Sequence, residues 1–206
     1  MARDMTPIVK QSRREKVALH PKAIKGLTKK PYGPGEHGQS GMRSKLSQYA
    51  VQLREKQKVK RSYGLLEKQF VKLVKEAERR EGVSGEILIV LLEQRLDNAV
   101  YRLGLSTSRR AARQLVTHGH FLLNGRRVDI PSIRVKAGDV ITIRPKSAAN
   151  EYFKVALEGL ATASDQNRWL SWDAKKQTAT VTGLPVREDV IDLDINEQLI
   201  IEFYSR

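Results

Sequence analysis

The sequence predicts an α+β protein in which an extended basic arm precedes a helical part and a small β-sheet. Apolar residues recur at helical spacing between residues 44 and 103. Asn124-Gly125 separates two apolar runs, which is typical of a β-hairpin. Residues 1–43 hold four prolines and five glycines without a sustained period, so we expect no regular element there.

The predicted arm is strongly basic. Chain segments with this composition cannot stabilise themselves by burial, so we expect the arm to become ordered on a polyanion. Its cations include Arg13, Arg14, Lys16, Lys22, Lys25, Lys29 and Lys30.

Ser44 is the predicted N-cap of the first helix, which extends to about Arg61. Leu46, Tyr49 and Leu53, with Ala50, form its expected apolar stripe. Cations occupy most of the remaining circumference, an arrangement that favours contact with phosphates on several sides. These candidate RNA-binding residues are Arg54, Lys56, Lys58, Lys60 and Arg61.

Residues 65–80 and 86–103 repeat apolar side chains at helical spacing, and both are predicted to form core helices. A short helix from Ser108 to His118 should end at Gly119, in the position of a left-handed residue. Its arginines cluster opposite its apolar side, and with the hairpin tip they offer planar donors to phosphates and bases. The candidate RNA contacts here are Arg109, Arg110, Arg113, Asn124, Arg126, Arg127 and Lys136.

The predicted arginine face of the helix from Ser108 to His118 implies a simple result for a double substitution. If Arg109 and Arg113 lie on a polar surface, replacing both by alanine weakens RNA binding without unfolding the protein.

Short strands are predicted at residues 120–123, 126–130 and 140–144. A helix is expected over residues 147–163, a hairpin from 169–172 and 178–182, and a final strand at 199–204.

The net charge of +15 is concentrated in two segments. Residues 1–61 carry a net charge of +12 and residues 106–136 carry +6, whereas 62–105 are neutral and 137–206 carry −3. Two polyanion-facing regions are therefore expected, with nucleic acid favoured over a membrane surface as the partner. No run of 18 apolar residues occurs, which predicts an intracellular protein with no membrane partner.

His118 and His120 flank Gly119 and could be metal ligands, a catalytic pair, RNA contacts or parts of the turn. The chain has no cysteine, and no third ligand or nearby nucleophile accompanies the pair, so the last two readings are favoured. The acidic group Glu188, Asp189, Asp192 and Asp194 is interpreted as a solubilising loop or a contact for a basic neighbour. We expect no metal and no cofactor.

Three stretches carry a family resemblance. Leu96 to Ile141, LDNAVYRLGLSTSRRAARQLVTHGHFLLNGRRVDIPSIRVKAGDVI, resembles the RNA-binding module named after small-subunit ribosomal protein S-four. The same module occurs in enzymes that act on RNA. PGEHGQSGMRSKLSQYAVQLREKQKVKRSYGLLEKQF, at residues 34–70, and INEQLIIEFYS, at 195–205, are similar to the ribosomal family itself.

The resemblance implies a structural, non-enzymatic ribosomal protein that binds small-subunit ribosomal RNA and nucleates assembly of its 5′ domain. It also implies basic residues, here Arg43 and Lys45, along the channel through which messenger RNA enters. A C-terminal contact with small-subunit protein five, linked to decoding accuracy, is implied as well. The expected location is the ribosome, in the cytoplasm or an organelle.

The implied architecture is a helical first domain into which the RNA-binding module is inserted. The expected segments are the arm at 1–43, helices at 44–95, the module at 96–160 and a returning C-terminal segment at 161–206. Some family members hold zinc through cysteines in the arm, which this chain lacks. The alternative is an RNA-modifying enzyme or RNA chaperone that uses the module for targeting.

Overall fold

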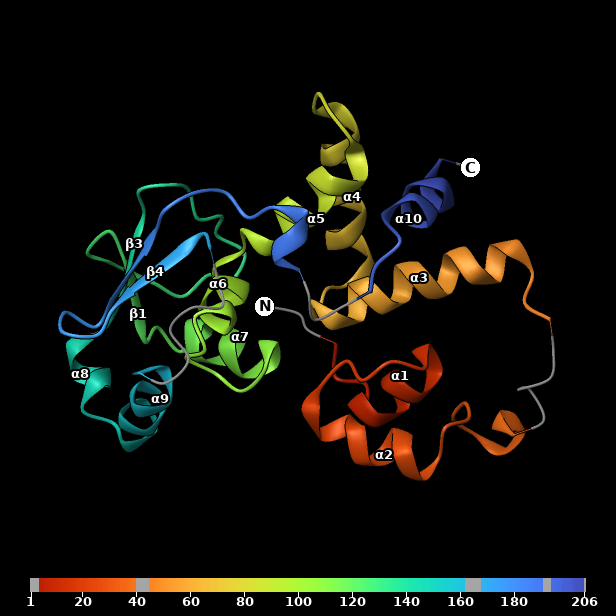
Figure 1. Cartoon of the computed structure of the whole chain (residues 1–206), viewed down its shortest axis with the longest axis horizontal. Helices are drawn as coiled ribbons and strands as arrows, with labels where there is room; N and C mark the ends of the chain where they lie inside the picture. The colour runs from red at the N-terminus through yellow and green to blue at the C-terminus, as the bar shows by residue number, and fades with distance from the viewer. Residues whose placement is uncertain (1–3, 40–44, 162–167, 191–193, 206) are drawn as a thin grey trace. The chain divides into compact units, whose positions relative to one another are not determined.

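The chain divides into two compact units. The computed structural model describes residues 4–39, 45–161, 168–190 and 194–205. One unit comprises residues 1–88 and 193–206, and the other comprises residues 89–192. The first is helical, whereas the second contains the sheet, which agrees with the predicted α+β class (Figure 1).

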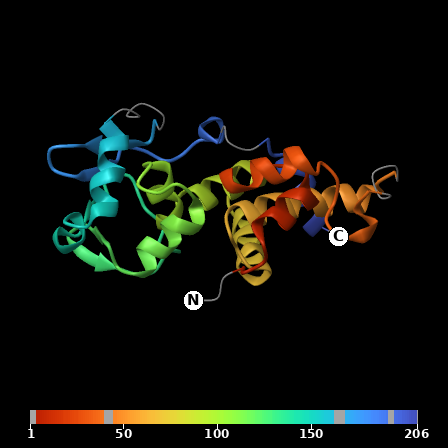
Figure 2. The same ribbon diagram turned by 90° about the horizontal axis from the view of Figure 1, so that it is seen from below.

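The helical unit is built around one long helix, α3 (Gln48–Ser62). In Figures 1 and 2, α1 (Ile8–Glu15) and α2 (Ile24–Lys29) lie together, and α1 packs against α3. The short helical turns η1 (Pro21–Ala23) and η2 (Glu36–Gly38) belong to the same region. The helices α4 (Glu67–Arg79) and α10 (Glu197–Tyr204) complete the unit.

The prediction of an extended arm is wrong for α1 and α2. The buried side chains of α1 are the polar residues Gln11, Ser12 and Glu15, so no apolar period marks this helix in the sequence. Arg13 fixes the later part of the segment, because its guanidinium donates to the carbonyls of Tyr32 and Gly33 at 3.0 and 2.9 Å. Tertiary hydrogen bonds therefore order this segment within the chain itself.

The helix predicted from Ser44 is confirmed as α3, but its buried face differs from the expected one. Ser47 caps it by accepting a hydrogen bond from the backbone N–H of Ala50 at 3.3 Å, and Ser44 lies outside the described residues. Leu46 and Tyr49 of the expected apolar stripe are exposed. The buried face consists of Gln52, Lys56, Val59 and Ser62, and most of it is polar.

The strand predicted at residues 199–204 is wrong, because this segment forms helix α10. A short apolar run such as LIIEFY fits a buried strand or a helix equally well by pattern. Asn196 decides the outcome locally, since its side chain accepts the backbone N–H of Leu199 at 3.3 Å and caps the helix. The helix then packs on α3, where Gln52 donates to Glu202 at 2.9 Å.

The expected helix over residues 86–103 is interrupted in the structure. It forms α5 (Ser84–Glu93) and α6 (Leu96–Arg102), separated by an extended Arg95. The backbone N–H of Leu96 donates to Ile133 at 2.8 Å, and that of Val135 donates to Gln94 at 2.9 Å. These hydrogen bonds to residues 133–135 take the place of intrahelical backbone hydrogen bonds where the helix is interrupted at Arg95. The core predicted from the leucine pattern is confirmed, since its residues are buried in both helices.

The sheet of the second unit is fully antiparallel, in the order β2-β1-β3-β5-β4. The first three strands, β1 (Phe121–Leu123), β2 (Arg126–Val128) and β3 (Val140–Ile143), match the prediction. The expected hairpin of β4 (Leu170–Asp173) and β5 (Thr178–Val181) also forms. The hairpin was expected to return to the first domain with residues 161–206, but it pairs with β3 and belongs to the second unit. This pairing covers an edge that β3 would otherwise leave open.

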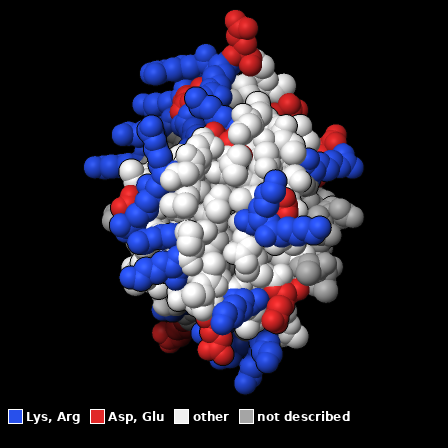
Figure 3. Space-filling view, turned by 90° about the vertical axis from the view of Figure 1, so that its left-hand side faces the viewer, with Lys and Arg blue, Asp and Glu red and all other residues white. Residues whose placement is uncertain are grey.

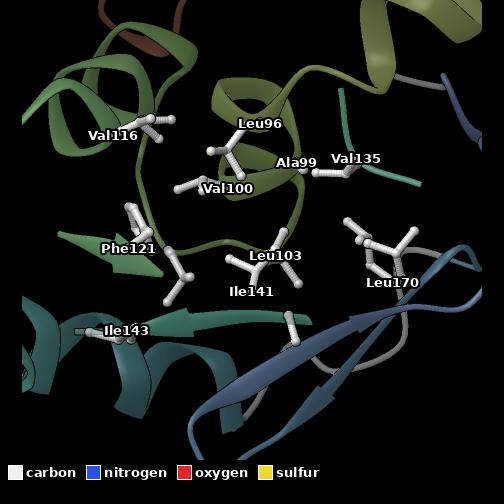
Figure 4. Packing of buried hydrophobic residues seen from close by; sticks show 14 of the residues in the cluster. Leu96, Ala99, Val100, Leu103, Val116, Phe121, Val135, Ile141, Ile143 and Leu170 are labelled. Carbon is white, nitrogen blue, oxygen red and sulfur yellow. The ribbon is translucent and has the colours of Figure 1, made fainter. Parts of the chain in front are cut away.

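Helices cover the sheet and build the core. In Figure 4, Leu96 and Val100 of α6 and Val116 of α7 (Arg109–Thr117) point toward Phe121 and Ile141 of the strands. The helices α8 (Pro145–Ala148) and α9 (Glu151–Ala161) follow β3, and the turn η4 (Arg187–Asp189) follows β5. This apolar core holds α7 and the β1–β2 hairpin, on which the predicted site residues of the second unit lie.

Candidate nucleic-acid interface

The β1–β2 hairpin presents two exposed arginines. Asn124 and Gly125 both have positive φ, at 50° and 78°, as a two-residue type I′ turn requires. The Asn124 side chain ties the turn to the start of β3, because its oxygen accepts the N–H of Val140 and its nitrogen donates to Asp139, both at 2.8 Å. Arg126 and Arg127 follow on the edge strand and are exposed.

Gly119 brings Arg127 close to the end of α7. Gly119 ends the helix in the left-handed region, at φ 71°, as the sequence predicts. A Cβ built on Gly119 would lie 2.6 Å from the Nε of Arg127. The guanidinium therefore lies directly over the glycine backbone, and the helix end and the hairpin form one continuous surface.

The two histidines beside Gly119 differ in environment. His118 is exposed, whereas the ring of His120 lies 2.9 Å from the hydroxyl of Ser147 and packs edge-on against Phe153. Burial lowers the pKa of His120, and the neighbouring His118 and Arg144 lower it further. Among the residues that the structure describes, no group of three or more His, Cys, Asp or Glu could hold a metal ion.

The α7 arginines do not form the open polar face that the helical wheel predicts. Arg113 is 8% exposed, and its guanidinium lies 3.5 Å from the carboxylate of Asp97. Arg109 donates to Asn98 at 2.8 Å and covers the ring of Tyr101. Arg110 is half-buried. Two of the three arginines are therefore held against the protein by polar partners on α6.

Two buried acids organise this cluster. Glu93 accepts hydrogen bonds from Arg102 at 2.8 and 2.9 Å and from Asn98 at 2.7 Å. Asp97 accepts two hydrogen bonds from Arg95, at 3.1 and 2.8 Å. The sequence signal for these partners is the pair of acids Glu93 and Asp97, four residues apart within an otherwise apolar helical pattern. A search for hydrophobic periodicity alone does not detect this signal.

The predicted cations of α3 are also engaged with acids. Arg54 donates to Glu15 of α1 at 3.1 Å, and Arg61 donates to the same oxygen. Burial raises the pKa of Glu15, and the nearby arginines oppose this effect. Lys58 pairs with Glu55 at 2.8 Å and donates to the carbonyl of Asp194.

Lys56 is the clearest departure from the predicted surface. It is 4% exposed, donates to Glu67 at 2.7 Å and lies over the ring of Phe203. Lys60 and Tyr204 also donate to Glu67, at 2.9 and 2.6 Å. Burial of Glu67 is outweighed by the hydrogen bonds from Lys56, Tyr204 and Lys60, which lower its pKa to about 2.

Many other cations point outward. Lys45 and Lys136 are exposed, and Arg43 lies outside the described residues. On the helical segment before α3, a set of exposed cations forms what we term the N-terminal basic surface: Lys10, Arg14, Lys16, Lys22, Lys25, Lys29 and Lys30. Figure 3 shows Lys and Arg gathered along one side of the face that it presents.

Comparison with known proteins identifies the family. The profile described as "Ribosomal protein S4/S9 N-terminal domain" matches residues 3–93, and that of the "S4 domain" matches residues 94–141. The "Small ribosomal subunit protein uS4" of Chloroflexus aurantiacus is 49% identical over 207 residues, which cover all of both chains. The chain belongs to the uS4 family of small ribosomal subunit proteins.

Other uS4 relatives are equally similar. The Clostridioides difficile protein is 50% identical over 212 residues, covering both chains completely. The "uS4A" protein of Clostridium botulinum is 54% identical over 180 residues, which cover 87% of this chain and 84% of the relative. The predicted resemblance is confirmed: the chain is an RNA-binding structural protein of the small ribosomal subunit and not an enzyme. In its described part, no helix is long and apolar enough to cross a membrane.

Proposed function

We propose that this uS4 protein binds small-subunit ribosomal RNA through two basic surfaces, one in each unit. The first is the N-terminal basic surface. The second, the hairpin basic surface, consists of Arg126, Arg127, Lys136 and His118. The observation that carries the proposal is that these side chains are exposed, whereas the cations of α3, and Arg109 and Arg113 of α7, are directed to carboxylates and other side chains of the protein.

Outward cations suit this role because neutralised phosphates release counterions, which supplies much of the binding free energy. Arginine at a hairpin tip can also fork onto a phosphate or stack on an unpaired base. The inward cations stabilise the fold that presents these surfaces. In this account the protein binds early to the 5′ domain of the RNA and nucleates its assembly, in the cytoplasm or in an organelle.

Two further contacts belong to the same proposal. Arg43 and Lys45, before α3, line the channel through which messenger RNA enters. The exposed Tyr49 of α3 and the half-buried Phe203 of α10, whose ring centroids are 5.5 Å apart, form an apolar patch. Such a patch suits a protein contact, and we assign it to small-subunit protein five, with a contribution to translational accuracy.

Footprinting of the full-length protein on small-subunit ribosomal RNA tests the proposal. The Arg126→Ala/Arg127→Ala variant should lose protection at one RNA region while the remaining footprint persists. Lys175→Ala/Lys176→Ala is the matched control, because it removes the same charge from the exposed β4–β5 turn. Equal losses in both variants would show that net charge, and not the hairpin surface, determines binding.

A further inference from the structure

Two further cations lie at the corner of the second unit where β3 ends and α8 begins (Figure 1). Arg144 follows the last residue of β3 and is half-buried, and Lys146 lies in α8 and is exposed. We term this pair the corner cations. Neither is among the RNA contacts predicted from the sequence, and both lie beyond residue 141, where the match to the S4 domain ends.

The order of the strands brings this corner next to the β1–β2 hairpin. The central strand β1 lies between β2 and β3, and Phe121 pairs with Val128 on one side and with Ile143 on the other. The pairing continues past β3, because the N–H of Arg144 donates to the carbonyl of His120 at 2.9 Å. Neighbouring strands are about 4.8 Å apart, so the corner lies only two strand spacings from β2.

Residues 118–120 connect the hairpin basic surface to the corner. On the hairpin side, the guanidinium of Arg127 lies over the backbone of Gly119. On the corner side, the ring centroids of His118 and His120 are 6.0 Å apart, and His120 is bonded through its carbonyl to the backbone after β3. The cations of the hairpin and of the corner therefore border one continuous stretch of backbone.

Hydrogen bonds to neighbouring residues fix the backbone of the corner. Ser147 is 5% exposed, and its hydroxyl lies 2.9 Å from the Nδ1 of His120. The backbone N–H of Ser147 donates to the carbonyl of Arg144 at 2.7 Å. Pro145 begins α8 and restricts its own φ. Binding of a ligand at this corner therefore requires little ordering of the backbone.

The charged neighbours of His120 are cationic. Burial lowers the pKa of its ring, and the positive charges of His118 and Arg144 lower that pKa further. A group of cations close to one another favours an anionic partner, and the phosphates of RNA are such a partner.

Three acids lie near the corner cations in the sequence, and none of them forms an ion pair with this pair. Asp139 lies at the opposite end of β3, where it accepts hydrogen bonds from the hairpin turn and from the loop before the strand. Asp129 follows β2, and Glu151 begins α9. Within the described part of the chain, the corner cations have no carboxylate partner, unlike the cations of α3.

We propose that the corner cations bind backbone phosphates of ribosomal RNA, so that one RNA strand crosses the end of the sheet from Arg127 to Lys146. This extends the hairpin basic surface and rests on the RNA-binding function proposed above. Cations on β2 and beyond β3 are roughly 10 Å apart and can each neutralise a different phosphate of the same strand. Such contacts position the RNA without reading its bases.

The salt dependence of RNA binding tests this extension. Affinity of the full-length protein for small-subunit ribosomal RNA is measured between 50 and 200 mM salt. Arg144→Ala/Lys146→Ala should reduce the slope of log affinity against log salt by about two, because each phosphate contact contributes about one. Lys175→Ala/Lys176→Ala is the matched control, since it removes the same charge from the exposed β4–β5 turn, and it should keep the slope.

A second pair of variants separates RNA contact from folding. Arg144 is half-buried, so the thermal midpoint of each variant is followed by tryptophan fluorescence. Lys146→Glu changes an exposed side chain and should reduce the slope by at least one with an unchanged midpoint. Arg144→Lys keeps the charge and should keep the slope of the unchanged protein.

An unchanged slope in either Arg144→Ala/Lys146→Ala or Lys146→Glu would overturn the proposal, as would an equal decrease in the control. An acidic segment of a neighbouring protein as the true partner would give that unchanged slope with isolated RNA. If only Arg126→Ala/Arg127→Ala reduces the slope, the corner proposal fails and the proposed RNA-binding function stands. A flat salt response of the unchanged protein would instead contradict the RNA-binding function itself.

Discussion

The buried acid Glu93 allows the clearest test of how the second unit is stabilised. Its side chain is fully buried and accepts three hydrogen bonds, two from Arg102 and one from Asn98. Glu93→Gln keeps the shape of the side chain but removes the charge that compensates Arg102. Breaking a buried ion pair from one side costs about 3–5 kcal/mol, so we expect a loss of roughly 3 kcal/mol in the free energy of unfolding.

Tryptophan fluorescence reports this loss selectively. Trp169 and Trp172 are the two tryptophans of the chain, and both lie in the second unit. For a unit of this size, a loss of 3 kcal/mol lowers the thermal midpoint by roughly 12 °C or more. Glu86→Gln, on the exposed side of the same helix, should leave the midpoint nearly unchanged. Equal midpoints for Glu93→Gln and the unchanged protein would refute the role assigned to this acid.

Three further predictions follow from the same contacts. Arg109→Ala with Arg113→Ala should lower the fluorescence-detected unfolding midpoint, because Arg113 is buried beside Asp97; an unchanged midpoint would restore the sequence-based view of an open arginine face. The pKa of Glu67 is about 2 when folded, against 4.5 ordinarily, so its contribution to stability is complete above pH 4.5 and is lost as the pH falls toward 2. Acid unfolding followed by circular dichroism should therefore show a smaller loss in that window for Glu67→Gln, and parallel curves would contradict the assignment. Gly119→Ala should destabilise the second unit by about 1–2 kcal/mol, because its φ is positive and the Cβ displaces a guanidinium; unchanged urea unfolding would argue against this strain.

The sequence predicted the second unit much better than the first. In the second unit the buried stripes are apolar, as with Ala99, Val100 and Val116, so hydrophobic periodicity located the helices and the core. The Asn124-Gly125 turn likewise determined the hairpin. The break at Arg95 was not predictable, because it depends on hydrogen bonds to residues 131–135.

In the first unit, the buried stripes are largely polar. α1 buries Gln11, Ser12 and Glu15, and α3 buries Gln52 and Lys56, so apolar periodicity missed one helix and assigned the wrong face to the other. Their burial is compensated by partners distant in sequence, which no local pattern reveals.

The same physics limited the prediction of site residues. A basic residue in the sequence can serve RNA or a buried carboxylate, and composition does not distinguish the two. Lys56 and Arg113 have carboxylate partners, whereas Arg126 and Arg127 are exposed on an edge strand. Three-dimensional structure was needed to separate the cations that stabilise the fold from those available to a partner.

The salt dependence of ribosomal RNA binding tests the central claim most directly. Affinity of the full-length protein for the 5′ domain RNA is measured between 50 and 200 mM salt. If the two basic surfaces neutralise about six phosphates, the affinity falls by about 10³-fold over this range. Arg126→Ala/Arg127→Ala should reduce the slope of log affinity against log salt by about two, because each of these arginines neutralises about one phosphate. A flat salt response, or an unchanged slope in that variant, would contradict the account.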